Sequence, residues 1–348
     1  MTDSPTDPAG SPQDRFSTGA DDAPEIRDVN LVDDEIDTRA LLAIAEAAVD
    51  EAEATFTAAV GADPAVMKSP GDFATEADLS VERQLRTLLT RYTGMPVHGE
   101  EYGVVRPGEQ VEINPNDEYA DEFDGPQSKP PKGPSNPGLH ELPETCWVVD
   151  PIDGTANYAV GNPFCCILVS LVHKGEAVVA VCEMPLLGRR ITARKGHGLF
   201  VDGHPARRMP PSDPAITQIG FGSILSQRRG NLPVSYRQDM LNAIGRTYPR
   251  MRVSGSCGID LAFTAAGVFG GTVTFSPNLW DNCAGILMIR ENGGVVTDFA
   301  GNRWVPGVSG IVAGEPEVHA NLIRHIQSVP IGTAARNAQD VKDRGGIR

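Results

Sequence analysis

Two amphipathic segments near the start of the chain have the periodicity of helices. In residues 39–60 and again in residues 77–92, apolar side chains recur at spacings of three and four, which places them on one helical face. Asp37 or Thr38 is available as the N-cap of the first segment, and Thr75 as that of the second. The later part of the chain predicts four further helices, at residues 236–246, 258–268, 281–292 and 316–327.

Between these helices the apolar pattern changes to that of strands. Residues 146–150, 165–175 and 176–184 are apolar runs, and Lys174-Gly175 marks a hairpin turn between the last two. Short strands with glycine turns follow at residues 189–208, and strand-like and helix-like segments alternate after them. Strands and helices in this arrangement predict a mixed α/β fold built from packed layers.

Two stretches lack this patterning and carry most of the net charge of −16. Residues 1–38 are rich in Asp, Pro, Ser and Gly and carry −9, and residues 104–144 contain eight prolines and carry −6. Such compositions bury too little apolar surface to offset the entropy of the chain. We therefore predict a disordered extension at 1–38, a folded domain at 39–328 with a disordered insertion at 104–144, and a flexible tail at 329–348. The insertion is either a lineage-specific loop or a regulatory, partner-binding one.

Composition narrows the class of protein. With 348 residues, of which 40% are hydrophobic and 22% charged, the chain is typical of soluble globular proteins. Its acidic balance argues against nucleic-acid binding, which needs Lys and Arg, and no apolar run approaches the roughly 20 residues of a membrane span. There is no signal-peptide pattern and no disulfide framework, and Cys165 and Cys166 lie in an apolar strand. We expect a cytoplasmic protein with neither nucleic-acid nor membrane partners.

The sequence DPIDGT at residues 150–155 carries the clearest chemical signal. It follows an apolar strand, so Asp150 lies at the strand's carboxyl end, where open α/β sheets bind their ligands. Asp150 and Asp153 are three residues apart across a turn and can converge on one hard cation, with the Ile152 carbonyl as a further oxygen. Gly154 and Thr155 then offer backbone N–H groups to a phosphate. The alternative is that DG forms only a turn.

Further acidic residues stand at the ends of other predicted elements. Glu100 and Glu101 follow a short strand-like stretch, Asp281 starts an apolar helix, and Asp78 starts the second helix. Each has a plain alternative: Asp281 and Asp78 as helix caps, and Glu100 as a solvated loop charge. Taken together they form an oxygen-only ligand set without His or Cys at metal-ligand spacing, which favours Mg²⁺ over zinc.

Three of these motifs, in order, resemble the signatures of the inositol monophosphatase family of Mg²⁺-dependent, lithium-sensitive phosphatases. They are GEE at 99–101, DPIDGT at 150–155 and WDNCAG at 280–285, and GGVVTDFAG at 293–301 and DFATEAD at 72–78 add to the likeness. The resemblance covers roughly residues 39–328 without the insertion. It implies a layered αβαβα sandwich of the inositol monophosphatase and fructose-1,6-bisphosphatase type, a homodimer, and two or three Mg²⁺ per site.

The resemblance also implies roles for individual residues. Glu100, Asp150 and the Ile152 carbonyl match ligands of a first metal, and Asp150, Asp153 and Asp281 match ligands of a second. Glu100 also matches a third, weaker metal site. Asp78 and Thr155 match the pair that orients the attacking water. The substrate contacts correspond to Asp153, Gly154, Thr155, Ser256 and Asp281.

The substrate is the least determined point. Family members that act on inositol phosphate carry an acidic residue a few positions before the WD, whereas residues 273–279 here contain none; Thr274, Ser276 or Asn278 are possible replacements. Ser256 is either a pocket residue or part of a turn before a helix. The basic residues Arg189, Arg190, Arg194 and Lys195 either reach a second phosphate or form a solvated face.

From these observations we expect the protein to be a phosphoric monoester hydrolase that uses metal-activated water. Inositol 1-phosphate is the first candidate substrate, and fructose 1,6-bisphosphate, histidinol phosphate and 3′-phosphoadenosine 5′-phosphate are alternatives. The non-enzymatic alternative is a family member associated with RNA or transcription. The chain has no GxxxxGK[ST] motif, and its histidines have no nucleophile at a recognisable spacing, so a P-loop kinase and phosphohistidine chemistry are not expected.

Overall fold

The computed structural model describes residues 36–69, 72–105, 142–209, 213–224, 232–306, 308 and 310–330. The extension and tail predicted at 1–38 and 329–348 lie almost wholly outside these residues, as do residues 106–141 of the predicted insertion. Of that insertion, Val104 and Val105 belong to a short strand, β4 (Gly103–Val105). Among the described residues, none of the helices combines the length and hydropathy that a bilayer crossing requires.

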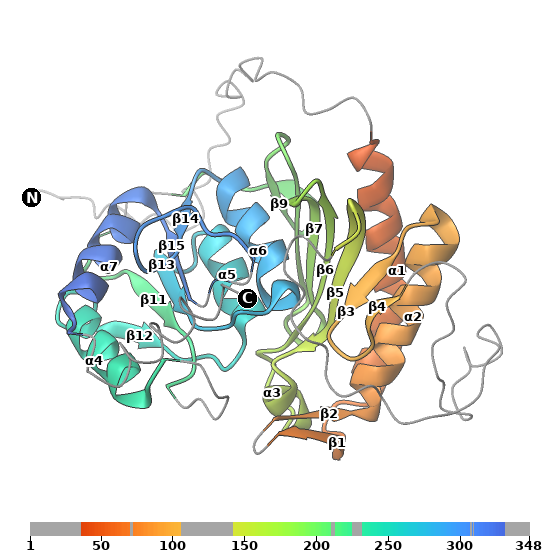
Figure 1. The fold of residues 1–348 in the computed structure, drawn as a ribbon, viewed down its shortest axis with the longest axis horizontal. Helices are drawn as coiled ribbons and strands as arrows, with labels where there is room; N and C mark the ends of the chain where they lie inside the picture. Colours follow the sequence, from red (N-terminus) through yellow and green to blue (C-terminus); the bar gives the residue numbers. More distant parts are fainter. Residues whose placement is uncertain are drawn as a thin grey trace, which may run out of the picture.

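Figure 1 shows five layers, in the order helices, sheet, helices, sheet, helices, which is the αβαβα arrangement expected. The first layer contains α1 (Thr38–Ala58) and α2 (Glu76–Thr93), joined by the hairpin of β1 (Pro64–Ser69) and β2 (Asp72–Thr75). Asp37 caps α1 by accepting from the backbone N–H groups of Arg39 and Ala40. The mixed α/β prediction is confirmed.

The large sheet has eight strands in the order β10-β9-β8-β7-β6-β5-β3-β4. All neighbours are antiparallel except β3 and β5, which run parallel. The strands are β3 (Val97–Gly99), β4, β5 (Thr145–Asp153), β6 (Cys166–His173), β7 (Glu176–Met184), β8 (Arg189–Arg194), β9 (Leu199–Val201) and β10 (His204–Pro205). A 3₁₀ turn, η2 (Pro185–Leu187), joins β7 to β8. The predicted hairpin turn is present, with positive φ at Lys174 and Gly175.

The remaining layers complete the fold around the second sheet. Its five strands, in the order β12-β11-β13-β15-β14, are β11 (Gln218–Phe221), β12 (Arg250–Arg252), β13 (Gly271–Thr274), β14 (Val295–Thr297) and β15 (Ile311–Gly314). Between the two sheets lie α5 (Cys257–Ala265) and α6 (Leu279–Glu291), and α4 (Val234–Gly245) and α7 (Pro316–Ser328) cover the outer face (Figure 1). The four later helices match their predicted positions within two residues at the start and three at the end.

Three apolar cores hold these layers together, and β5 takes part in two of them. Trp147 and Val149 pack against α1 and α2, whereas Val148 faces the layer of α5 and α6. A strand buried on both faces has to be apolar throughout, which explains the continuous run before Asp150. This burial fixes the carboxyl end of β5 close to the start of α6.

Candidate active site

Asp150 and Asp153 lie at the carboxyl end of β5, and both are buried. The pairing of β5 with β6 becomes irregular between these two residues, because the Asp-Pro-Ile-Asp segment bends there. Gly154 follows with φ +88°, and a Cβ on it would lie 2.9 Å from the Phe164 carbonyl oxygen. Only glycine fits both the backbone conformation and the space, and the short helix α3 (Thr155–Ala159) starts directly after it.

Glu100 and Asp281 reach Asp150 from two other elements. Glu100 lies in the turn between β3 and β4, and Asp281 lies in the first turn of α6. Carboxylate oxygens of these three residues all lie within 4.8 Å of one another. Within the described part of the chain, this is the group of acidic, His and Cys side chains that could hold a metal ion. The structure thus brings together three of the predicted ligands.

Burial and mutual repulsion perturb this cluster strongly. Burial, followed by the negative charges of the neighbouring carboxylates, raises the pKa of Asp150 well above its usual range. The same causes raise the pKa of Asp281 to about 7. Asp150 Oδ1 is buried without a hydrogen-bond partner. An unpartnered carboxylate oxygen among like charges is what a hard cation would satisfy, so these residues fit Mg²⁺.

Asp153 is held by the start of α5. Its Oδ2 accepts hydrogen bonds from the Gly258 N–H at 2.7 Å and from the Ser256 hydroxyl, and it lies 3.7 Å from the Cys166 thiol. Burial raises the pKa of Asp153 to about 6, although these donors oppose the shift. Ser256 also caps α5 by accepting from the Ile259 N–H. Ser256 thus caps the helix and contacts a site carboxylate, and its place in a substrate pocket stays a prediction.

Asp78 and Thr155, the two residues expected to orient a water molecule, lie side by side. Thr155 Oγ1 is 3.2 Å from Asp78 Oδ1 and 3.1 Å from the Ile152 carbonyl oxygen. Asp78 Oδ2 accepts from Thr75 N at 2.7 Å and from Thr75 Oγ1 at 2.6 Å in a complete capping box. Asp78 thus caps α2 with one oxygen and faces Thr155 with the other, and burial raises its pKa to about 6.

Lys68 is the site residue that the sequence analysis missed. It lies on β1, and its ammonium group is 2.8 Å from Glu100 Oε1 and 2.6 Å from Glu101 Oε1. The two carboxylates raise its pKa above the usual lysine range in spite of burial. Burial, with Glu100 as the next cause, raises the pKa of Glu101 to about 9. The only signal for Lys68 in the sequence is its position shortly before DFATEAD.

Two of the three candidate replacements for the missing acidic residue donate hydrogen bonds to Asp281 instead. Asp281 Oδ2 accepts from the Ser276 hydroxyl and from Asn278 Nδ2, the latter at 3.2 Å. Thr274 Oγ1 is buried and has no hydrogen-bond partner. Ser276 and Asn278 therefore orient the Asp281 carboxylate, and Thr274 is the one of the three that forms no hydrogen bond with Asp281 among the described residues.

Three of the four basic residues of the hairpin form ion pairs with acidic residues outside the carboxylate cluster. Arg189 pairs with Asp202, Arg190 with Glu183 and Asp50, and Lys195 with Glu176. These ion pairs support the interpretation of the hairpin as a solvated face. The buried His98, two residues before Glu100, packs against Trp280 with ring centroids 5.4 Å apart and ring planes tilted by 56°, and burial lowers its pKa to about 4. It is a neutral packing residue between β3 and α6.

An acidic, oxygen-only site at the carboxyl end of a strand in an αβαβα sandwich defines the class of metal-dependent phosphoric monoester hydrolases. Residues 33–330 match the profile of the inositol monophosphatase family, and the chain belongs to that family. It is 37% identical over 285 residues to a probable inositol 1-monophosphatase, ImpA, of Mycobacterium tuberculosis. That alignment covers 82% of this chain and 93% of the relative.

More distant relatives have different names. The Nus factor SuhB of Salmonella typhimurium is 33% identical over 52% of this chain and 67% of its own length. A fructose-1,6-bisphosphatase/inositol-1-monophosphatase of Thermotoga maritima is 29% identical over 55% of this chain and 72% of its own. The sequence therefore assigns the chain to the family, whereas the relatives carry the names of different functions.

Solved structures show the same fold. The extragenic suppressor protein suhB from Bartonella henselae superposes with a TM-score of 0.68 at 23% identity, over 83% of this chain and 99% of its own. An IMPase/NADP phosphatase complexed with Mg²⁺ and phosphate superposes with a TM-score of 0.62 at 17% identity, over 84% and 96%. The five-layered sandwich is thus the fold of this family.

Proposed function

We propose that the protein hydrolyses a small phosphate monoester in a Mg²⁺-dependent reaction, with inositol 1-phosphate as the first candidate substrate. The observation that carries the proposal is the convergence of Glu100, Asp150 and Asp281 beside the Asp78–Thr155 pair. The 37% identity to a relative named as an inositol 1-monophosphatase supports the choice of substrate. Two or three Mg²⁺ per site and inhibition by lithium are part of the proposal.

The metal ions would be held by Glu100, Asp150, Asp281, Asp153 and the Ile152 carbonyl. When bound, Mg²⁺ supplies positive charge that offsets the charge of the phosphate and polarises its oxygens. Without that charge, the buried carboxylates would repel a phosphate monoester. The acidic cluster is therefore a substrate site only in combination with a cation.

The remaining residues position the reactants. The Thr155 hydroxyl oxygen and Asp78 Oδ1 accept hydrogen bonds from the attacking water, which orients the lone pair of the water toward phosphorus. The backbone N–H groups of Gly154 and Thr155 donate to phosphate oxygens, and Asp153, Ser256 and Asp281 contact the substrate. Most of the acceleration in such transfers comes from positioning and charge stabilisation, which suits a site built on rigid elements.

A comparison of substrates tests this function. Full-length protein stripped of metal and then supplied with Mg²⁺ is assayed for phosphate release from inositol 1-phosphate, fructose 1,6-bisphosphate, histidinol phosphate and 3′-phosphoadenosine 5′-phosphate. We expect the largest kcat/KM for inositol 1-phosphate. A larger value for another member of the set would reassign the substrate, and no release from any of them would refute the phosphatase.

A role in transcription is the second candidate, because a relative of 33% identity is named as a Nus factor. Binding of the Asp150→Asn variant to RNA or to transcription proteins, in the absence of phosphatase activity by the wild type, would favour it.

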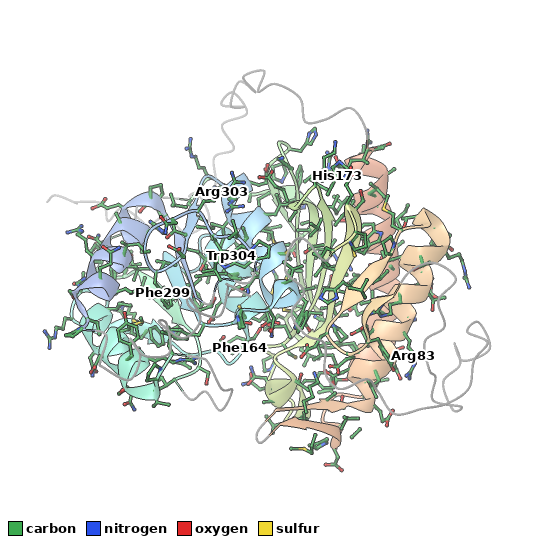
Figure 2. The ribbon with its side chains drawn as sticks, viewed as in Figure 1. Arg83, Phe164, His173, Phe299, Arg303 and Trp304 are labelled. Carbon is green, nitrogen blue, oxygen red and sulfur yellow. The ribbon has the colours of Figure 1, made fainter. Side chains whose placement is uncertain are left out.

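We also propose a homodimer in the cytoplasm. Exposed apolar side chains of Val160, Phe164 and Val253 border the same short stretch, because the Asn157 amide donates to the carbonyls of Phe164 and Ser254. Figure 2 shows Phe164 between the two halves of the molecule, near α3. A monomer at micromolar concentration in analytical ultracentrifugation would contradict the dimer.

A further inference from the structure

Glu82, a buried glutamate on α2, lies directly beneath the turn that carries Glu100. Its side chain is fully buried, and its Oε2 accepts the Glu101 N–H at 2.7 Å. Its Oε1 accepts the Tyr102 N–H at 3.1 Å. A single carboxylate thus accepts the two backbone N–H groups that follow Glu100. A charge-assisted pair of this kind fixes a turn more strongly than neutral hydrogen bonds do.

Arg86, four residues further along α2, binds both of the strands that flank the turn with Glu100. Its guanidinium donates to Glu82 Oε1 from Nε at 2.8 Å and from Nη2 at 2.6 Å. It also donates to the Val97 carbonyl at 2.8 Å and to the Gly103 carbonyl at 2.5 Å. Val97 is the first residue of β3 and Gly103 the first of β4, so the ion pair holds the whole β3–β4 hairpin onto α2.

The hairpin approaches Glu82 so closely that no side chain fits between them. A Cβ built on Gly99 would lie 2.1 Å from Glu82 Oε1. Gly99 has no unusual φ, so here the glycine is required by the close approach and not by its backbone conformation. The position of Glu100 relative to α2 is therefore set by the Glu82 carboxylate.

The same face of α2 also carries Asp78. Asp78, Glu82 and Arg86 are spaced four residues apart, which places them in a row along one side of the helix. α2 thus holds one site carboxylate directly and a second, Glu100, through Glu82. Glu82 itself contacts neither Asp150 nor Asp281 in any hydrogen bond of the described structure.

We propose that Glu82 is a positioning residue that sets the affinity of the site for Mg²⁺, by holding Glu100 close to Asp150 and Asp281 against their repulsion. This inference rests on the metal dependence in the proposed function. If the turn is released, Glu100 moves away from the other two carboxylates, because their like charges repel it. The site then loses the Glu100 carboxylate as a metal ligand, although Glu100 itself is not substituted.

The test is a comparison of wild type with Glu82→Gln, both as full-length, metal-stripped protein. Gln has the same shape, but it loses the charge that Arg86 and the two N–H groups require. Binding of Mg²⁺ is measured by titration calorimetry, and phosphate release is measured as a function of Mg²⁺ concentration. We expect Mg²⁺ affinity to fall by about 10- to 100-fold, as for other residues that orient metal ligands. We expect kcat at saturating Mg²⁺ to stay within about threefold of wild type.

Glu76→Gln is the matched control, because Glu76 lies exposed on the first turn of the same helix. It should leave Mg²⁺ affinity unchanged. Glu82→Asp retains the charge and should recover part of the affinity, whereas Gly99→Ala should reproduce the loss by displacing the turn from the other side. If Glu82→Gln fails to fold, by circular dichroism, these two variants carry the test.

Two results would overturn the proposal. One is a folded Glu82→Gln protein that binds Mg²⁺ with wild-type affinity. The other is a kcat at saturating Mg²⁺ that falls well beyond about threefold, because it would show that Glu82 acts on more than metal binding. Because calorimetry needs no substrate, a failure of the phosphatase assay with every substrate would leave the effect of Glu82 on metal binding measurable.

Discussion

Asp150→Asn should abolish phosphatase activity and at the same time stabilise the metal-free protein. Asp150 is buried between Glu100 and Asp281, and its Oδ1 has no hydrogen-bond partner. The amide has almost the same shape as the carboxylate and no charge. Its introduction therefore removes a metal ligand, but it also relieves the repulsion that the folded chain maintains in the absence of a cation.

The size of the stabilisation follows from the geometry. Two unit charges 4.8 Å apart repel each other by about 3.5 kcal/mol at an effective dielectric constant of 20. Asp150 has two such neighbours. Protonation of one member of the cluster and the positive charge of Lys68 reduce the repulsion, so we expect a net gain of about 2 kcal/mol in the free energy of unfolding at about pH 8.

Urea unfolding of EDTA-treated wild type and variant measures this gain. It should shrink at about pH 5, where the raised pKa values of Asp150 and Asp281 keep these two carboxyls protonated in the wild type. It should reverse in excess Mg²⁺, which stabilises only a protein that binds it. Asp239→Asn, an exposed substitution on α4, is the matched control and should have no such effect. A metal-free Asp150→Asn protein that is no more stable than wild type at about pH 8 would refute the reasoning.

Three further predictions concern pH, Lys68 and Gly154. The pKa values of Asp281 (about 7) and Asp153 (about 6) in the folded protein exceed the ordinary value of 3.8. Between the ordinary and the raised pKa, the native state therefore binds more protons than the unfolded state. The free energy of unfolding of the metal-free protein should thus fall as pH rises from about 4 to about 7, and a flat profile would contradict this. Lys68→Met removes a cation beside Glu100 and should raise Mg²⁺ affinity severalfold in calorimetry; weaker binding would show that Lys68 assists the metal. Gly154→Ala places a residue with a Cβ at φ +88° and brings that Cβ to 2.9 Å from the Phe164 carbonyl oxygen. It should therefore lower the free energy of unfolding by about 1–3 kcal/mol, and a variant as stable as wild type would contradict this.

The parts of the site that the sequence predicts are those that stand at the ends of apolar elements. The apolar run before Asp150 and the apolar helix after Asp281 are visible in the sequence, so the carboxylates at their ends can be placed. The layered α/β class follows from the same runs. The five-layered arrangement and the division of metal roles came from the family resemblance, since periodicity alone does not specify how sheets stack.

The parts that could not be predicted depend on tertiary contacts between charged residues. Glu82 and Arg86 are four residues apart on a helix, a spacing that usually indicates a solvated ion pair. Here both are buried, because the β3–β4 hairpin covers them, and no local pattern indicates that cover. Lys68 likewise reaches Glu100 only through the way the β1–β2 hairpin folds.

The distribution of hydrogen-bond donors explains why Asp150 differs from the other site carboxylates. Asp78, Asp153 and Asp281 each have one oxygen fixed by neutral donors, which come from Thr75, Ser256, Gly258, Ser276 and Asn278. These donors orient the carboxylates and lower the cost of burying them. Asp150 Oδ1 has no such donor, and it lies where the charges of three elements meet. Of these four carboxylates, Asp150 therefore depends most on a bound cation to offset the cost of its burial. The charge that makes it a metal ligand is the same charge that destabilises the metal-free protein, so activity and stability oppose each other most strongly at this residue.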